Sequence, residues 1–148
     1  MSVQELGIES HIASAITPTA GAAGSINING SEIDMEGYEN LLIVVHTGAI
    51  VAGAAFSIKA QQDIVTGMAS AADLLGTSQT ILDTEDDQVR YIDIIKPIEQ
   101  FIRLVALIAT QNVTLCAFYI KYNGKKRPSV HGSNVSGETH ISPIEGTA

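Results

Sequence analysis

The clearest pattern along the chain is a series of three apolar runs of strand length. Residues 88–96, 101–109 and 113–122 are rich in β-branched and aromatic side chains, and turn-forming Pro, Gln and Asn residues separate them. We expect the second and third runs to pair as an antiparallel hairpin through residues 110–112. Pro97 should end the first run, because proline has no amide hydrogen to donate to a central strand.

The first part of the chain shows a similar but weaker pattern. Residues 10–16 and 25–29 alternate between apolar and polar positions, which is typical of half-buried strands. Residues 41–46 form a continuous apolar run that predicts a strand buried on both faces. Residues 54–62 alternate again and should form its partner strand, while the Thr-Pro-Thr-Ala-Gly sequence at 17–21 predicts a turn.

Between these runs the residue types predict one helix, one short strand and one loop. Residues 69–75 contain helix-forming side chains and are followed by Gly76, which suits a helix end. Residues 80–82 fit a short strand and residues 83–87 an acidic loop. About eight strands result, without the alternation of strands and helices that parallel sheets require. The pattern therefore predicts an all-β fold, an antiparallel jelly-roll-like β-sandwich.

The two ends of the chain differ from its middle. Residues 128–148 contain two prolines, three glycines and many Ser and Thr residues, with too few apolar side chains to form a core of their own. We therefore expect one β-sandwich domain over residues 8–127, with an N-terminal arm over residues 1–7 and an extended C-terminal tail over residues 128–148. Both ends are expected to lie on neighbouring subunits.

Composition and charge narrow the classes of function. Only 16% of the 148 residues are charged, against about 25% in typical soluble domains, which indicates a surface partly covered by partner subunits. The net charge of −8 argues against nucleic acid as a partner, because phosphate binding depends on Lys and Arg. Residues 1–58 hold six acids and no Lys or Arg, while residues 121–127 hold four bases. This uneven distribution of charge has two explanations. It either guides head-to-tail or ring assembly, or the charged residues lie on a surface that contacts only solvent.

Residues that could carry chemistry are few. The chain has four histidines, none with a partner at zinc-ligand spacing, namely His11, His46, His131 and His140. His46 is expected at a hydrogen-bonded core or interface position, His131 in a solvated tail, and Cys116 as a small buried apolar residue. The acidic residues 83–87 lack the spacing of a calcium loop. We therefore expect no catalytic residue, no cofactor and no metal.

A membrane location is also not expected. Residues 40–58 contain no charged side chain, but His46 and two glycines interrupt the run. Two strands joined by a loop explain these residues better than a membrane span.

Several soft motifs follow one another in an order that is similar to that of a known family. They are the acidic Gly-Tyr loop at 34–41, the apolar strand at 41–46, the alternating strand at 57–63, Tyr-Ile-Asp-Ile-Ile-Lys-Pro at 91–97, Phe-Ile-Arg-Leu-Val at 101–105, and Tyr122 before a Pro-bearing tail. In this order the chain resembles the small jelly-roll cement, or head-decoration, proteins of tailed bacteriophages, including the Bordetella phage cement type. The resemblance covers roughly residues 30–130.

The resemblance implies a structural virion protein rather than an enzyme. Such a protein is made in the host cytoplasm and binds the outer surface of the capsid, which it strengthens. The implied partners are the major capsid protein and further copies of the chain, as a dimer or trimer, with no nucleic acid and no membrane. The residues expected at the partner interface are Lys121, Lys125, Lys126, Arg127, Glu36, Tyr38 and Arg103.

Three alternatives remain open at this stage. A head–tail joining or tail protein would share the β-rich composition, and a ring of six or twelve copies would favour it. A carbohydrate-binding jelly roll would need an aromatic platform, for which Tyr91 and Tyr119 are candidates in a chain without Trp. A cupin enzyme would need clustered His and Glu on facing strands, and only His46 lies on a clear strand.

Overall fold

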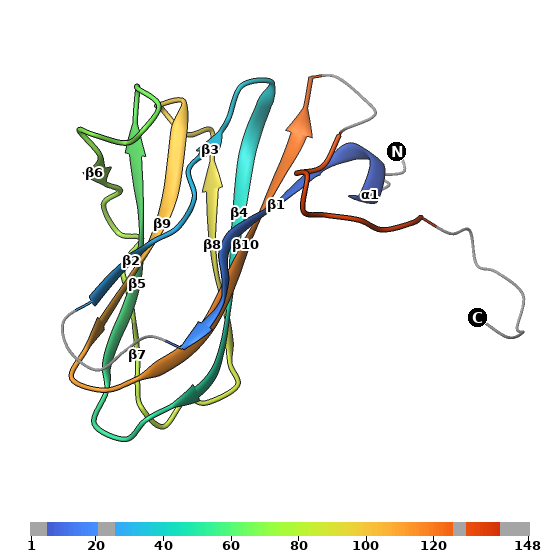
Figure 1. Ribbon diagram of the computed structural model, residues 1–148. Coiled ribbons are helices and arrows are strands. Elements are labelled where there is room, and N and C mark those ends of the chain that lie inside the picture. The colour runs from blue at the N-terminus through green and yellow to red at the C-terminus, as the bar shows by residue number, and fades with distance from the viewer. Residues whose placement is uncertain (1–5, 21–25, 126–129, 140–148) are drawn as a thin grey trace, which may run out of the picture.

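The computed structural model describes residues 6–20, 26–125 and 130–139. Within them the chain is almost entirely β-structure, with one short helix, α1 (Leu6–Glu9), before the first strand (Figure 1). Ten strands follow among these residues: β1 (His11–Ala20), β2 (Ile26–Asn29), β3 (Ile33–Asp34), β4 (Tyr38–Ile50), β5 (Ala55–Asp63), β6 (Ala72–Asp73), β7 (Gln79–Ile81), β8 (Val89–Ile95), β9 (Phe101–Ala109) and β10 (Val113–Gly124).

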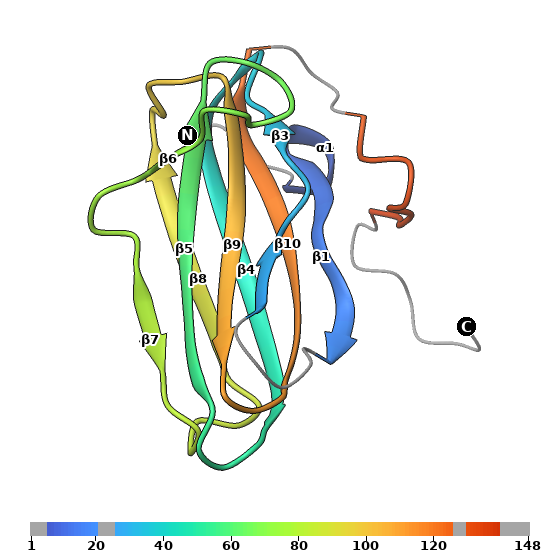
Figure 2. The ribbon, with the colours of Figure 1, turned by 60° about the vertical axis from the view of Figure 1, so that its left-hand side comes forward.

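The strands form two sheets that pack face to face (Figures 1 and 2). Sheet A has the order β1-β10-β4-β8, and sheet B has the order β2-β9-β5, with β6 and β7 on the free side of β5 and β3 on β9. Every strand pair is antiparallel. Without the two-residue strands β3 and β6, eight strands remain in two sheets of four, which is the jelly-roll arrangement. The predicted all-β, antiparallel sandwich is therefore confirmed.

The core lies between the inner faces of the two sheets. The alternation predicted for β5 is confirmed, since Phe56, Ile58 and Ala60 are buried. On β10 the completely buried Tyr119 reaches across the core to sheet B, where its hydroxyl accepts a hydrogen bond from the amide of Leu104 (2.8 Å). The alternate residues of each strand therefore point inward as the period-2 pattern requires.

Two predicted strand pairs are wrong. β9 and β10 do not form a hairpin but belong to different sheets, and β4 and β5 are likewise separated. The connections at residues 51–54 and 110–112 cross from one sheet to the other at the same end of the sandwich, where the amide of Val51 donates to the carbonyl of Asn112 (3.0 Å). Apolar alternation determines which face of a strand is buried, but it leaves the neighbouring strand undetermined.

The predicted helix at residues 69–75 is also wrong. This segment instead holds the two-residue strand β6, which pairs with Gln61 and Gln62 of β5. The amide of Leu74 donates to the carbonyl of Ala60 (2.9 Å), so the backbone of this segment bonds to the sheet rather than to itself. Pairing with the free edge of β5 overrides the local helix propensity, which is a weak preference.

The predicted turn at residues 17–21 is wrong for its described part, because β1 continues to Ala20. Two register shifts against β10 occur between Ser14 and Thr19. Pro18 is tolerated within this strand because β1 is an edge strand, where one side of the backbone needs no partner.

The described part of the C-terminal tail lies along the outer edge of β1, beside α1 (Figure 2). The amide of Gly132 donates to the carbonyl of Ile12 (2.9 Å), and the amide of Ile12 donates to Nδ1 of His131 (3.1 Å). His131, expected in solvent, is therefore half-buried and bonded. This segment lies on its own chain, whereas contacts of either end with neighbours stay a prediction. Leu6 and Gly7, placed in the N-terminal arm, belong to α1.

Candidate interaction surface

The outer face of sheet A carries a continuous set of apolar side chains. The strand registers place them in rows across the sheet, and in the central row Phe118, Val44 and Tyr91 stand side by side on β10, β4 and β8. We call the following set the outer apolar face: Ile12, Leu42, Val44, Val89, Tyr91, Ile95, Cys116, Phe118 and Ile120.

Exposure of this face is greatest at its β8 side. Tyr91 is 65% exposed, Val89 and Ile95 are each 59% exposed, and Phe118 on the central strand β10 is 38% exposed. In an antiparallel sheet, the face that contacts water usually carries polar residues. A contiguous apolar surface of this kind is a candidate site of contact with another protein.

Polar side chains share the rows of this face at several strand positions, among them Ser14 beside Phe118, His46 between Cys116 and Val89, and Asn40 beside Ile95. Among the strand positions of this face the one carboxylate is that of Asp93, which stands beside Leu42 and accepts a hydrogen bond from the hydroxyl of Tyr122 (2.7 Å). Burial of Tyr122 and the neighbouring carboxylate raise the pKa of the Tyr122 hydroxyl to about 12. The side chain of His46 is exposed on the same face, so its predicted core position is wrong and its interface position stays a prediction.

The apolar run at residues 41–46 behaves differently from expectation. Its inward residues Leu41, Ile43 and Val45 are completely buried, but Leu42 and Val44 are only half-buried on the outer side. The prediction of burial on both faces is therefore wrong within this chain. Cys116, expected to be buried, is likewise half-buried on the outer face. The apolar outer positions of this run were the sequence signal for the face, and the predicted interface residues did not include them.

The predicted interface residue Lys121 is 7% exposed at the end of sheet A. Its Nζ donates to the carbonyl of Asp34 (2.7 Å) and lies 4.5 Å from the ring centre of Tyr38. Burial lowers the pKa of Lys121 from its ordinary value, and the charge of Asp34 opposes that shift. Lys121 and Tyr38 thus form a cation–π pair that closes this end of the sandwich.

The other predicted interface residues are distributed over two regions. Glu36 and Lys125 are exposed near the Lys121–Tyr38 pair, and the amide of Lys125 donates to the carbonyl of Gly37 (2.9 Å). Arg103 lies on sheet B, where its Nε donates to Oε1 of Gln61 (2.9 Å), so it does not join this group. Lys126 and Arg127 lie outside the described residues.

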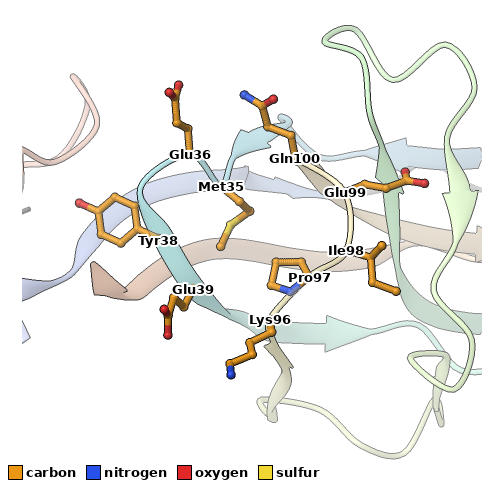
Figure 3. Close-up of a pocket in the computed structure, with 9 residues that line it drawn as sticks. All are labelled: Met35, Glu36, Tyr38, Glu39, Lys96, Pro97, Ile98, Glu99 and Gln100. Atoms are coloured by element: carbon orange, nitrogen blue, oxygen red, sulfur yellow. The ribbon is translucent and has the colours of Figure 1, made fainter. Parts of the chain in front are cut away.

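A hollow of about 670 Å³ lies between the loop before β4 and the connection from β8 to β9 (Figure 3). Met35 and Pro97 lie near its middle, while the carboxylates of Glu36, Glu39 and Glu99 point in three different directions. Because these carboxylates do not converge, the hollow lacks the paired acid and base that hydrolytic chemistry uses.

The acidic loop at residues 83–87 uses its carboxylates to hold the backbone. Asp83 accepts from the amide of Gly53 (2.6 Å), and Asp86 accepts from the amide of Ile50 (2.7 Å). Oε1 of Glu85 is 2.6 Å from Arg90.

Among the described residues, no group of three or more His, Cys, Asp or Glu side chains is placed to bind a metal ion. Within the same residues, no helix has the length and apolar character needed to cross a membrane.

Comparison with known proteins shows a likeness at the level of the fold. No protein-family model and no curated protein matches the chain. Among solved structures, a chain from the structure of infectious bursal disease virus, Gx strain, aligns with a TM-score of 0.53 and 12% identity over 80% of this chain. A chain from the Gt strain of that virus aligns with a TM-score of 0.49 and 10% identity over the same share. This chain spans 33% of each of those chains.

Proposed function

We propose that this protein is a structural, non-catalytic component of a virus particle that assembles with other protein subunits. The observation that carries the proposal is the outer apolar face of sheet A, where Tyr91, Val89 and Ile95 are more than half exposed among the described residues. Burial of one large apolar side chain contributes roughly 1.5–3 kcal/mol, so several on one face favour association strongly. The shared fold with a chain from a virus structure supports the virion setting.

Within that class, we propose the role of a head-decoration, or cement, protein on the outer capsid surface of a tailed bacteriophage. The ordered motifs of the sequence support this assignment, and the major capsid protein is the proposed partner. A net charge of −8 suits the outside of a shell that encloses DNA, since like charges repel. Many modest contacts, multiplied over the copies on one particle, would strengthen the shell through avidity.

The end of the sandwich that carries Glu36 and Lys125 is the proposed contact with the capsid. Both side chains are exposed, they have opposite charges, and they lie near the pair of buried Lys121 and half-buried Tyr38 at this end. Such an arrangement presents charged groups from a rigid base, which favours a specific orientation on the partner.

The test is binding of the purified full-length protein to heads assembled from the major capsid protein encoded in the same genome. Co-sedimentation followed by electron cryo-microscopy should show added density at fixed lattice positions on the outer surface. A heat-release assay should then show that decorated heads retain DNA at higher temperature than bare heads. Absence of binding to both unexpanded and expanded heads would contradict the proposal, and density confined to the tail vertex would favour the head–tail joining role.

A further inference from the structure

We propose that the outer apolar face of sheet A binds the same face of a second copy of this chain, so that the two sheets stack in a two-fold dimer. This inference rests on the proposed function in one respect, because the dimer would be the unit that binds the particle. It goes further by naming the surface, the partner and the symmetry of the contact.

The charge distribution favours a second copy as the occupant. Each copy carries a net charge of −8, so two copies repel one another over most approaches. On the outer apolar face the one carboxylate among the strand positions is Asp93, and the Tyr122 hydroxyl already bonds it. One carboxylate per copy is a small share of the net charge of −8, so two copies meet on this face with less electrostatic repulsion than over most other approaches.

The size and shape of the face also fit a sheet as partner. Four strands spaced about 4.8 Å apart and about six residue steps of 3.3 Å give a flat area of about 400 Å². Side chains that stand out from this plane increase the accessible area, so two copies together would bury on the order of 1,000 Å². This area is near the lower limit for a specific protein–protein interface. Aligned stacking at a small angle is the usual packing of two such sheets.

The exposed aromatic residues provide the centre of the contact. Tyr91 and Phe118 flank Val44 in the central row, and an isologous contact places each beside its counterparts on the second copy. Aromatic residues at the centre of an interface commonly contribute most of its binding energy. The carbonyl of Tyr91 at the β8 edge already accepts a hydrogen bond from Nε2 of Gln79 (2.8 Å), which leaves the Tyr91 side chain exposed on the face.

The experiment measures the mass of the full-length protein by sedimentation velocity between about 1 and 100 µM, the range of weak to moderate dimers. The wild type should reach twice 15.6 kDa. Tyr91→Glu and Phe118→Glu should each weaken dimerisation at least tenfold, with an unchanged circular dichroism spectrum. Ile64→Glu is the matched control, because Ile64 is 70% exposed on a loop outside the face, and it should remain dimeric. A monomeric wild type at 100 µM, or dimers unaffected by both variants, would overturn the inference.

The single cysteine provides a second measurement that does not depend on the variants folding well. Cys116 is half-buried on the outer apolar face, so pairing should protect its thiol. The rate of its reaction with a thiol reagent should fall as the protein concentration rises through the dimer range. A rate independent of concentration would count against pairing on this face.

Failure of the dimer and failure of the proposed function give different results. A monomeric wild type that still decorates heads would remove the self-pairing and leave the virion role. A dimer that is sensitive to Tyr91→Glu but binds no heads would keep the pairing and remove the decoration role.

Discussion

The hydroxyl of Tyr119 on β10 accepts a hydrogen bond from the amide of Leu104 on β9, so a single side chain joins the two sheets through the core. The same hydroxyl donates to the carbonyl of Ser31 (2.8 Å). Tyr119 is completely buried, and this burial raises the pKa of its hydroxyl well above the ordinary value. Three segments that are distant in sequence therefore depend on one hydroxyl.

We expect Tyr119→Phe to lower the free energy of unfolding by about 1–3 kcal/mol, because it leaves the Leu104 amide and the Ser31 carbonyl without this partner. Urea unfolding followed by circular dichroism measures the change. Tyr91→Phe is the control, since the exposed Tyr91 should change stability by less than about 0.5 kcal/mol. Equal stability of the Tyr119 variant and the wild type would show that the hydroxyl does not hold the sheets together.

Gly30 lies where the backbones of three segments approach closely. A methyl group at this position would lie 3.0 Å from the carbonyl oxygen of Leu104 and 3.1 Å from that of Ala15. Because both neighbours are backbone atoms of packed strands, we expect Gly30→Ala to destabilise the protein by about 1–3 kcal/mol. Gly137→Ala is the control, since among the described residues no atom beyond the two chain neighbours lies within 4 Å of the added methyl group there. Thermal unfolding should show a lower Tm for the first variant alone.

Acid should weaken the fold through His11. Burial lowers the pKa of His11 from its ordinary value, the nearby charges of Lys121 and His131 lower it further, and a hydrogen bond with the Val130 carbonyl opposes these effects. The unfolded chain therefore binds the proton more readily than the folded chain. Stability should fall as the pH decreases through the ordinary histidine value of about 6.5.

Urea unfolding at several pH values between 7.5 and 5.5 measures this dependence. His11→Gln should show a smaller decrease over the same interval, because it removes the titrating group while it keeps a polar side chain. If the wild type and the variant lose stability in parallel, the pH dependence arises from other groups.

His131 holds the tail segment to the rest of the chain by both ring nitrogens. Nδ1 accepts from the amide of Ile12, and Nε2 lies 2.9 Å from the carbonyl of Gly7, so the ring acts as a donor at Nε2. Loss of such hydrogen bonds should lower the free energy of local opening of the tail segment by about 1 kcal/mol, which is roughly a fivefold increase in the population of the open form. His131→Ala should therefore speed hydrogen exchange at Gly132 and proteolysis near residue 130, with little change in global unfolding. Ser136→Ala, an exposed change in the same segment, should leave both rates unaltered.

Strands β5 and β9 show what a pattern of side chains can and cannot predict. The alternation of Phe56, Ile58 and Ala60 identified the inner face of β5, and the absence of regularly spaced helices indicated antiparallel sheets. The partner of β9 could not be predicted in the same way, because β10 has the same pattern and follows after a loop of turn length. Residues 69–75 were predicted as a helix because propensity is local, whereas their hydrogen bonds with β5 depend on a distant strand.

The candidate surface was visible in the sequence only in part. The amino-acid pattern shows that residues 41–46 carry apolar side chains on both sides of one strand, and that the chain has a low charge content and an acidic balance. Which of the two sides is buried follows from the packing of the sheets, since the inner side meets sheet B while Val44, Phe118 and Tyr91 stay accessible. The physical reason is that side-chain alternation belongs to one strand, but coverage of a sheet face depends on which other elements the fold brings over it.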